Sequence, residues 1–174
     1  FRGCTALTHI DFPSTITSVG AGAFMSCEQM TRVRFVPGTS KVTLGDNLFS
    51  QCWHLNSVTL PQTADRITAG MFESCSSLPE LYIPASVTEI GENPFVSCRF
   101  LGVIRFGGSQ SDWDRMASPY LKASLQSMGT QVVYDVDFDD PFAKDPNDPG
   151  DFFPTDPDPD NPDQPPVDPT PDEH

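Results

Sequence analysis

The sequence lacks the residue patterns that most enzymes need. Its 174 residues contain no nucleophile elbow, no H-E-x-x-H helix, no P-loop and no dinucleotide fingerprint. Serine and threonine are present, but they fall at predicted corners, where they favour turns. We therefore expect neither catalysis nor a cofactor.

Residues that hold metal ions are also scarce. The three histidines, His9, His54 and His174, are far apart, and no C-x-x-C pair is present. A structural zinc site requires close clusters of these residues. Aspartates alternate with prolines at residues 156–160, but this run has neither the bending glycine nor the distal glutamate of a calcium loop. No structured metal site is expected.

Long apolar runs and positive charge are missing too. No stretch of about 18 apolar residues exists, so the sequence predicts no membrane span. Acidic residues outnumber basic residues by 24 to 10, and this balance disfavours nucleic-acid binding.

The sequence does contain a repeat. Five cysteines follow one another at spacings of 23, 25, 23 and 23 residues, and a phenylalanine stands three residues before each of them. The pairs are Phe1 and Cys4, Phe24 and Cys27, Phe49 and Cys52, Phe72 and Cys75, and Phe95 and Cys98. Apolar residues recur three, six and eight positions after each cysteine. A fixed period of this length is typical of a solenoid.

Each repeat contains a strand pattern. Leu81 and Ile83 alternate with Glu80 and Tyr82, and this period of two indicates a half-buried strand. A second short apolar element follows, with a glycine at or near its end. We interpret the Phe-x-x-Cys segment as one helical turn, because residues three apart on a helix share a face. The second repeat is two residues longer, and residues 36–41 are expected to form a corner loop.

The cysteines are predicted to lie in the core. Stacked coils place their thiols in one column about 5 Å apart with parallel side chains. A disulfide requires Cβ atoms turned toward each other, and the number of cysteines is odd. Disulfides are the alternative interpretation. A free cysteine behaves as a small buried hydrophobe, so the cysteines here do not indicate a redox compartment.

Residues 4–24 read Cys-x-x-Leu-Thr-x-Ile-x-Phe-Pro-x-x-Ile-Thr-x-Val-Gly-x-x-Ala-Phe, and residues 75–95 repeat much of this pattern. The pattern resembles the BspA-type leucine-rich-repeat family of bacterial and protist surface proteins, over roughly residues 1–134. The resemblance implies a leucine-rich-repeat solenoid, mainly parallel β with short helical turns. It also implies surface display and binding of host or matrix proteins, and it supplies no catalytic residues. Ala64 and Pro94 depart from the pattern, and neither is expected in the core columns.

We divide the chain into three parts. Residues 1–108 are the predicted solenoid, with four to five coils. Because it begins inside a repeat at Phe1, we expect further coils upstream, with a secretion signal that is not in this sequence. Residues 109–134 are predicted to form a C-terminal cap of helix and strand, in which Trp113 covers the last coil. Such a unit shields the open end of a solenoid core. Residues 109–116 contain serine N-cap candidates with acidic residues three positions on, such as Ser111 with Asp114.

Residues 135–174 differ sharply in composition from the rest. They hold 14 of the 24 acidic residues and 11 of the 18 prolines, with Lys144 as their one basic residue. This composition disfavours a packed core. At about 3 Å per residue in polyproline II, forty residues span on the order of 100 Å. We interpret the segment as a disordered linker or stalk, of which Phe138, Phe142, Phe152 and Phe153 are expected to dock the first half onto the cap.

The outward face of the main sheet is the predicted partner-binding surface. Solenoids use extended sheet surfaces for recognition, and arginine and tyrosine are enriched at interface hot spots. An ordinary solvated sheet face is the alternative. Arg32 and Arg34 beside Tyr82 make the preferred cluster. The predicted face consists of His9, Asp11, Arg32, Arg34, Thr59, Glu80, Tyr82 and Arg105.

These features predict a monomeric, non-catalytic protein-binding module at the cell surface, with an adhesive role toward a host or matrix protein. The alternative is a repeat region that is accessory to an enzyme or another domain elsewhere in a longer protein. The identity of the protein ligand is not written in the sequence.

Overall fold

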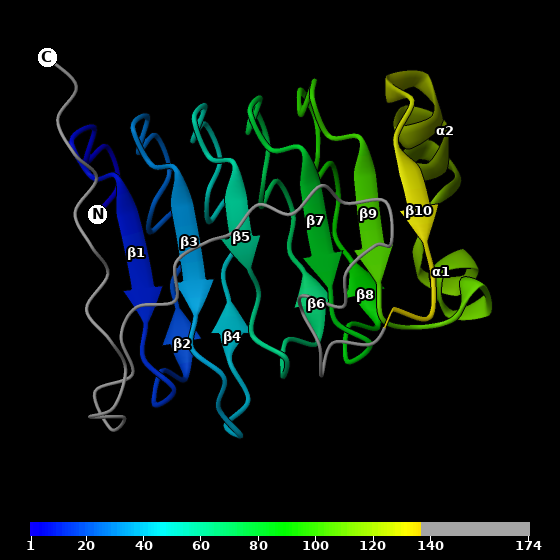
Figure 1. Ribbon diagram of the computed structural model, residues 1–174, viewed down its shortest axis with the longest axis horizontal. Coiled ribbons are helices and arrows are strands. Elements are labelled where there is room, and N and C mark those ends of the chain that lie inside the picture. The colour runs from blue at the N-terminus through cyan, green and yellow to red at the C-terminus, as the bar shows by residue number, and fades with distance from the viewer. Residues whose placement is uncertain (137–174) are drawn as a thin grey trace, which may run out of the picture. The chain divides into compact units, whose positions relative to one another are not determined.

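The computed structural model describes residues 1–136 of the protein (Figure 1). The expectations for the acidic segment from residue 137 onward, including docking by Phe138, Phe142, Phe152 and Phe153, lie outside the described residues. The described part is a parallel β solenoid, so the predicted fold class is confirmed there. We count each coil from its cysteine, so coil 1 is residues 4–26, coil 2 is 27–51, coil 3 is 52–74, coil 4 is 75–97, and coil 5 starts at Cys98.

The longer strands form the main sheet on one side of the coils, and all of their recorded pairings are parallel. They are β1 (His9–Phe12), β3 (Arg32–Phe35), β5 (Ser57–Thr59), β7 (Glu80–Ile83), β9 (Val103–Phe106) and β10 (Gln131–Val133). Their pairing gives two three-stranded sheets, β1-β3-β5 and β7-β9-β10, with a break between β5 and β7. Inward residues alternate with outward residues, as the sequence predicted.

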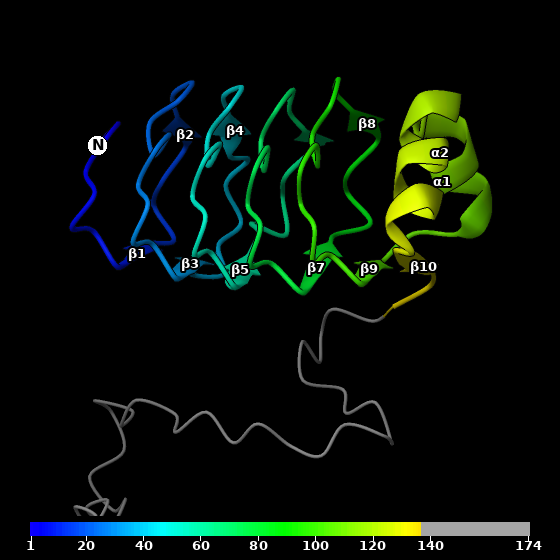
Figure 2. The same ribbon diagram turned by 90° about the horizontal axis from the view of Figure 1, so that it is seen from above.

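The shorter strands lie on the opposite side of the coils (Figure 2). They are β2 (Ser18–Val19), β4 (Thr43–Leu44), β6 (Arg66–Ile67) and β8 (Glu89–Ile90). The ladders join β2 to β4 and β6 to β8. No ladder joins β4 to β6, so this side of the solenoid has a break of its own, one step before the break in the main sheet.

The third side of each coil is the Phe-x-x-Cys segment, which we call the turn side. The segment is a set of hydrogen-bonded turns and not a regular helix: the Cys27 N–H donates to the Phe24 carbonyl at 3.2 Å. Ser26, the residue before the cysteine, has a positive φ of 61°, which a right-handed helix does not allow. Phenylalanine and cysteine nevertheless share the buried face, so that part of the interpretation is correct.

Stacked side chains fill the core. The phenylalanine rings of the turn side lie in one column, with centroids 5.4 to 6.1 Å apart from Phe1 to Phe95. Ala64 is 1% exposed and belongs to the core, so the expectation that it lies outside the core columns is wrong. Pro94 is buried as well. Both substitutions are accommodated because neighbouring coils supply the rest of the packing surface.

The C-terminal cap consists of helices α1 (Gln110–Met116) and α2 (Pro119–Met128) followed by β10. Trp113 is 2% exposed, and its ring centroid lies 5.7 Å from that of Phe106 in the last coil. Of the serine candidates, Ser109 is the N-cap, and Asp112 completes a capping box with it. The pair that starts at Ser111 has the same spacing, so the sequence does not distinguish the two.

Candidate interaction face

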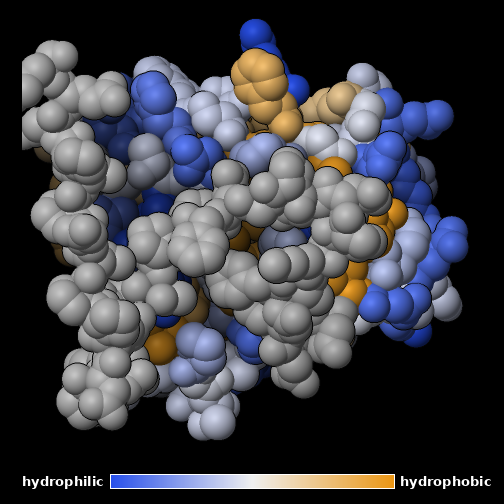
Figure 3. Space-filling view, in the orientation of Figure 1, coloured by the Kyte–Doolittle hydropathy of each residue, from blue (hydrophilic) through white to orange (hydrophobic). Residues whose placement is uncertain are grey.

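The outward side chains of the main sheet form two rows along the solenoid. Strand register places Asp11 opposite Arg34 and Arg34 opposite Thr59, and beyond the break it places Tyr82 opposite Arg105. The parallel row contains His9, Arg32, Ser57, Glu80 and Val103. Figure 3 looks onto this side; hydrophilic side chains predominate at the right-hand margin of the view.

Two arginines of this face are held by ion pairs. Arg32 contacts the Asp11 carboxylate at 3.2 Å, and both side chains are exposed, so this pair contributes little to stability. Arg105 contacts the Glu80 carboxylate at 3.2 Å and also lies over the Tyr82 ring, 5.7 Å from its centroid. The Arg105 side chain is 24% exposed, so it is the more firmly positioned of the two.

Arg34 differs from these two arginines. It is exposed, and within residues 1–136 no acidic group lies in ion-pair distance of it. Thr59 is its register partner on the next strand. A guanidinium that is exposed and not engaged within the described residues is available to a partner's carboxylate, with which it forms strong charge-assisted hydrogen bonds.

The preferred cluster of the sequence analysis is only partly assembled. Arg32 and Arg34 share β3, but Tyr82 lies on β7, and β5 stands between the two strands. At about 4.8 Å per strand, β3 and β7 are roughly 10 Å apart. The cationic neighbour of Tyr82 is Arg105, which the sequence placed on the same face without linking the two.

The face extends one strand further than the sequence analysis placed it. Strand β10 pairs with β9, and its register sets Gln131 beside Val103 and Val133 beside Arg105. Both β10 residues are exposed. The alternation around Val132, which packs against the core, indicates a strand here. The sequence does not show which sheet this strand joins, because two helices separate it from β9.

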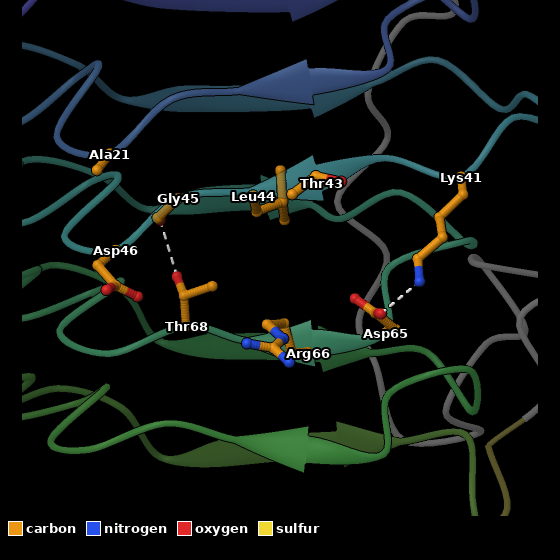
Figure 4. Close-up of a pocket in the computed structure, with 9 residues that line it drawn as sticks. All are labelled: Ala21, Lys41, Thr43, Leu44, Gly45, Asp46, Asp65, Arg66 and Thr68. Carbon is orange, nitrogen blue, oxygen red and sulfur yellow. Dashed lines mark hydrogen bonds and ion pairs between the residues drawn. The ribbon is translucent and has the colours of Figure 1, made fainter.

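A polar pocket of about 490 Å³ lies on the opposite side, between β4 and β6 (Figure 4). At one end Lys41 contacts the Asp65 carboxylate at 2.6 Å, and the hydrogen bond from Lys41 lowers the pKa of Asp65. Asp46 accepts a hydrogen bond from the Ala69 N–H at 3.2 Å. Arg66 pairs with Glu89 at 2.7 Å. The two basic and two acidic side chains that line the pocket balance in charge, and each of them has one of these partners.

The cysteine column lies in the core as predicted, except at its first member. Four thiols are buried, and each donates to the carbonyl of the phenylalanine in the preceding turn, as in Cys75 to Phe49 at 3.2 Å. Burial raises the pKa of Cys52 and of Cys98 to about 12. Cys4, in the first of the described coils, is free and exposed. A protonated buried thiol is neither a nucleophile nor a metal ligand.

Two further properties concern residues 1–136 alone. In this range no three side chains of histidine, cysteine, aspartate or glutamate gather closely enough to hold a metal ion. No helix in it has the length and apolar character needed to cross a membrane.

Fold and face together define a leucine-rich-repeat solenoid. The sequence model of the BspA type leucine rich repeat region matches residues 1–117 in six copies, and the chain belongs to this family. No curated protein matches the chain.

One solved structure supports the fold. A leucine rich cell surface protein from Faecalibacterium prausnitzii A2-165 is similar with a TM-score of 0.60 and 18% identity, over 75% of this chain and 33% of that protein. The T. pallidum leucine rich repeat protein aligns with a TM-score of 0.45 and 20% identity, over 71% of this chain and 84% of that one. The chain thus spans about a third of the length of the Faecalibacterium protein.

Proposed function

We propose that the chain is a non-catalytic protein-binding module of a cell-surface protein, and that the outer face of the main sheet receives the ligand. The observation that carries the proposal is the pair of outward rows, which runs along six strands and combines an exposed arginine with a tyrosine under a second arginine. Arginine and aromatic side chains are enriched among the residues that contribute most to protein–protein binding.

The cell-surface setting rests on the family and on the printed description of the Faecalibacterium protein. Under this proposal the protein acts as a monomer in adhesion to a host or matrix protein. Residues 1–108 are the binding solenoid, 109–134 close its end, and 135–174 act as a stalk or linker. An accessory role beside an enzyme or another domain is the competing proposal, and a catalytic domain in the same full-length gene would favour it.

The test is a binding screen against purified extracellular-matrix proteins, followed by a variant in which Arg32, Arg34 and Tyr82 are replaced by alanine. We expect this variant to bind any matrix protein that the screen identifies at least about tenfold more weakly, since hot-spot side chains each contribute more than about 1 kcal/mol. Calorimetry or surface plasmon resonance measures the change.

The matched control replaces the same residue types away from the face. Arg66, Arg99 and Tyr120 are exposed, and they lie on a short strand, on the turn side and on α2. Their triple alanine variant should bind like the wild type. Equal binding by the wild type and the face variant would remove the main sheet as the site.

A further inference from the structure

Coil 3 is attached differently to its two neighbours, and the first difference is on the short-strand side. Coil 2 is joined to coil 1 here by the Gly45 N–H, which donates to the Val19 carbonyl at 2.9 Å. Coil 4 is joined to coil 3 by the Gly91 N–H, which donates to the Ile67 carbonyl at 2.7 Å. Thr68 is the equivalent residue of coil 3, and no backbone hydrogen bond joins β4 to β6 among the described residues.

The side chain of Thr68 explains this break. At Gly45 a Cβ atom would lie 2.2 Å from the Ala21 nitrogen, and at Gly91 it would lie 2.5 Å from the Ala69 nitrogen. Only glycine allows coils to approach this closely. Thr68 has a Cβ, so coil 3 stands off from coil 2, and the Thr68 hydroxyl donates to the Gly45 carbonyl at 2.8 Å in place of the ladder. The pocket of Figure 4 lies in the resulting space.

The second difference is on the main-sheet side, between β5 and β7. Proline flanks β7 at both ends, as Pro79 and Pro84. At the position of Pro79, coils 2, 3 and 5 use an N–H to reach the preceding coil; the Thr31 N–H, for example, donates to the Thr8 carbonyl at 2.7 Å. At the position of Pro84, Gly107 donates to the Ile83 carbonyl at 2.9 Å, whereas coil 3 also has a proline, Pro61, and β5 still pairs with β3. Pro79 is therefore the residue that distinguishes this step. Proline has no N–H, so coil 4 cannot form either bond to coil 3.

The turn side is continuous at both breaks. Between coils 2 and 3 the N–H groups of Asn47, Phe49 and Gln51 donate to the next coil at 2.8, 2.9 and 2.7 Å. Between coils 3 and 4, three N–H groups of the equivalent positions do the same at 2.7 to 2.9 Å. The stacked phenylalanine rings also continue through both steps.

We propose that coil 3 is a built-in joint of the solenoid. Coils 1 and 2 are tied together on all three sides and form one block, and coils 4 and 5 with the cap form another. Coil 3 is held to the first block by the pairing of β3 with β5 and, on the short-strand side of the described residues, only by side-chain contacts such as Thr68 to Gly45 and Lys41 to Asp65. It is held to the second block by the pairing of β6 with β8, and to both blocks through the turn side. The two blocks rotate about the turn side, and the ladders that are missing are the ones that would resist this motion.

The joint divides the outward face of the main sheet. His9, Arg32 and Arg34 belong to one half, and Tyr82 and Arg105 belong to the other. A rotation at the step from β5 to β7 changes the distance between these halves. The face thus adjusts its curvature to a partner that contacts both halves. This flexibility does not depend on which class of ligand the face binds.

Amide hydrogen exchange on the intact chain, read residue by residue by NMR, tests the joint. The Glu80 N–H should exchange roughly tenfold or more faster than the equivalent amides of Ser57 and Val103, which are bonded to the preceding coil at 3.1 and 3.3 Å. The Thr68 N–H should likewise exchange faster than that of Gly45. Equal protection at these matched positions would overturn the proposal.

A repaired variant provides the second test. Pro79→Thr with Pro84→Val introduces the residue types found at the same positions in coil 2, and should slow exchange at Glu80 to the rate of Ser57. Pro13→Val is the control, because Pro13 occupies the column of Pro84 but lies in coil 1, away from the step between coils 3 and 4. It should leave exchange at Glu80 unchanged.

Distances between spin labels report the motion itself. Labels at His9→Cys and Val103→Cys, in a Cys4→Ser background, are about 19 Å apart at four strand spacings. We expect a broad distance distribution that narrows in the repaired variant. A distribution that is equally narrow in both proteins would show a rigid stack and refute the joint.

Discussion

Single residues at the corners decide how closely the coils approach each other. Gly45 and Gly91 lie against the backbone of the preceding coil, where no side chain fits. Gly20 occupies the same column, but nothing lies within 4 Å of the position of its Cβ atom. Gly20 is therefore a control for substitutions at Gly45 and Gly91.

Gly45→Ala should destabilise the protein by about 2 kcal/mol or more, because the added methyl group meets main-chain atoms that cannot move independently. Gly20→Ala should change the free energy of unfolding by less than about 0.5 kcal/mol, or raise it slightly. Urea unfolding followed by circular dichroism measures both. Similar losses of stability in the two variants would show that local backbone preference, and not contact between coils, requires glycine in this column.

For single residues, the sequence predicted the positions that recur in every repeat. It missed those whose burial or contacts depend on which side chains lie beside them in the fold. The buried thiols and stacked phenylalanines follow from one repeated spacing, so five copies reinforce each prediction. Ala64 was misplaced because a small side chain carries little hydrophobic signal. The contact between Arg105 and Tyr82 depends on rotamers across two strands, about which the sequence pattern carries no information.

Among the elements, the C-terminal cap shows where the structure defines a helix boundary that the sequence left open. In the capping box of α1, the Ser109 hydroxyl accepts from the Asp112 N–H at 3.2 Å, and the Asp112 carboxylate accepts from the Ser109 N–H at 3.1 Å. This box fixes the start of the helix that places Trp113 on the last coil. The sequence identified the helix and its tryptophan, and the boundary was ambiguous by one pair of residues.

Ser109→Ala should lower the free energy of unfolding by about 1 kcal/mol, because it leaves the Asp112 N–H without its acceptor. Ser111→Ala is the matched control: Ser111 is exposed inside α1, and its replacement should have little effect or stabilise the helix slightly. The midpoint of urea unfolding, followed by the fluorescence of Trp113, distinguishes the two. A larger loss for Ser111→Ala would instead favour Ser111 as the N-cap.

The breaks beside β5 and β6 were visible in the sequence once the columns were known. Pro79 and Thr68 each depart from their column in a way that removes a backbone contact between coils. A column read only for hydrophobicity does not reveal this, because neither residue interrupts the apolar pattern.

For the molecule as a whole, the buried thiols couple stability to pH. In the unfolded chain these cysteines titrate near their ordinary pKa of 9.0, whereas burial raises the pKa of Cys52 and Cys98 to about 12. A raised folded-state pKa means that the stability is fully present below pH 9 and is lost as pH rises toward 12. Each of these two thiols should lower the free energy of unfolding by about 1.4 kcal/mol per pH unit in that window.

Urea unfolding at pH 8, 9.5 and 10.5 in reducing buffer measures this slope. Tyrosine and lysine also titrate in this range, so the control is the Cys52→Ala/Cys98→Ala variant, whose stability should fall less steeply with pH even though it starts lower. Parallel slopes for the two proteins would mean that the thiols become accessible in the folded state at high pH.

The regular turn side has an electrical consequence. At each step from coil 1 to coil 4, three N–H groups point toward the following coil and three carbonyls point back, as with the Phe24 N–H and the Leu48 carbonyl at 3.1 Å. Aligned peptide dipoles add, as they do along a helix. The turn side is therefore polarised along the stack, with its positive pole toward the Trp113 end. The ends of the strands have the opposite polarity, because N–H groups such as those of Thr31 and Gly45 point toward the preceding coil. The turn side and the strand sides thus carry opposed backbone dipoles, in a region where the side chains of residues 1–134 nearly cancel in charge, with 10 acidic against 9 basic residues.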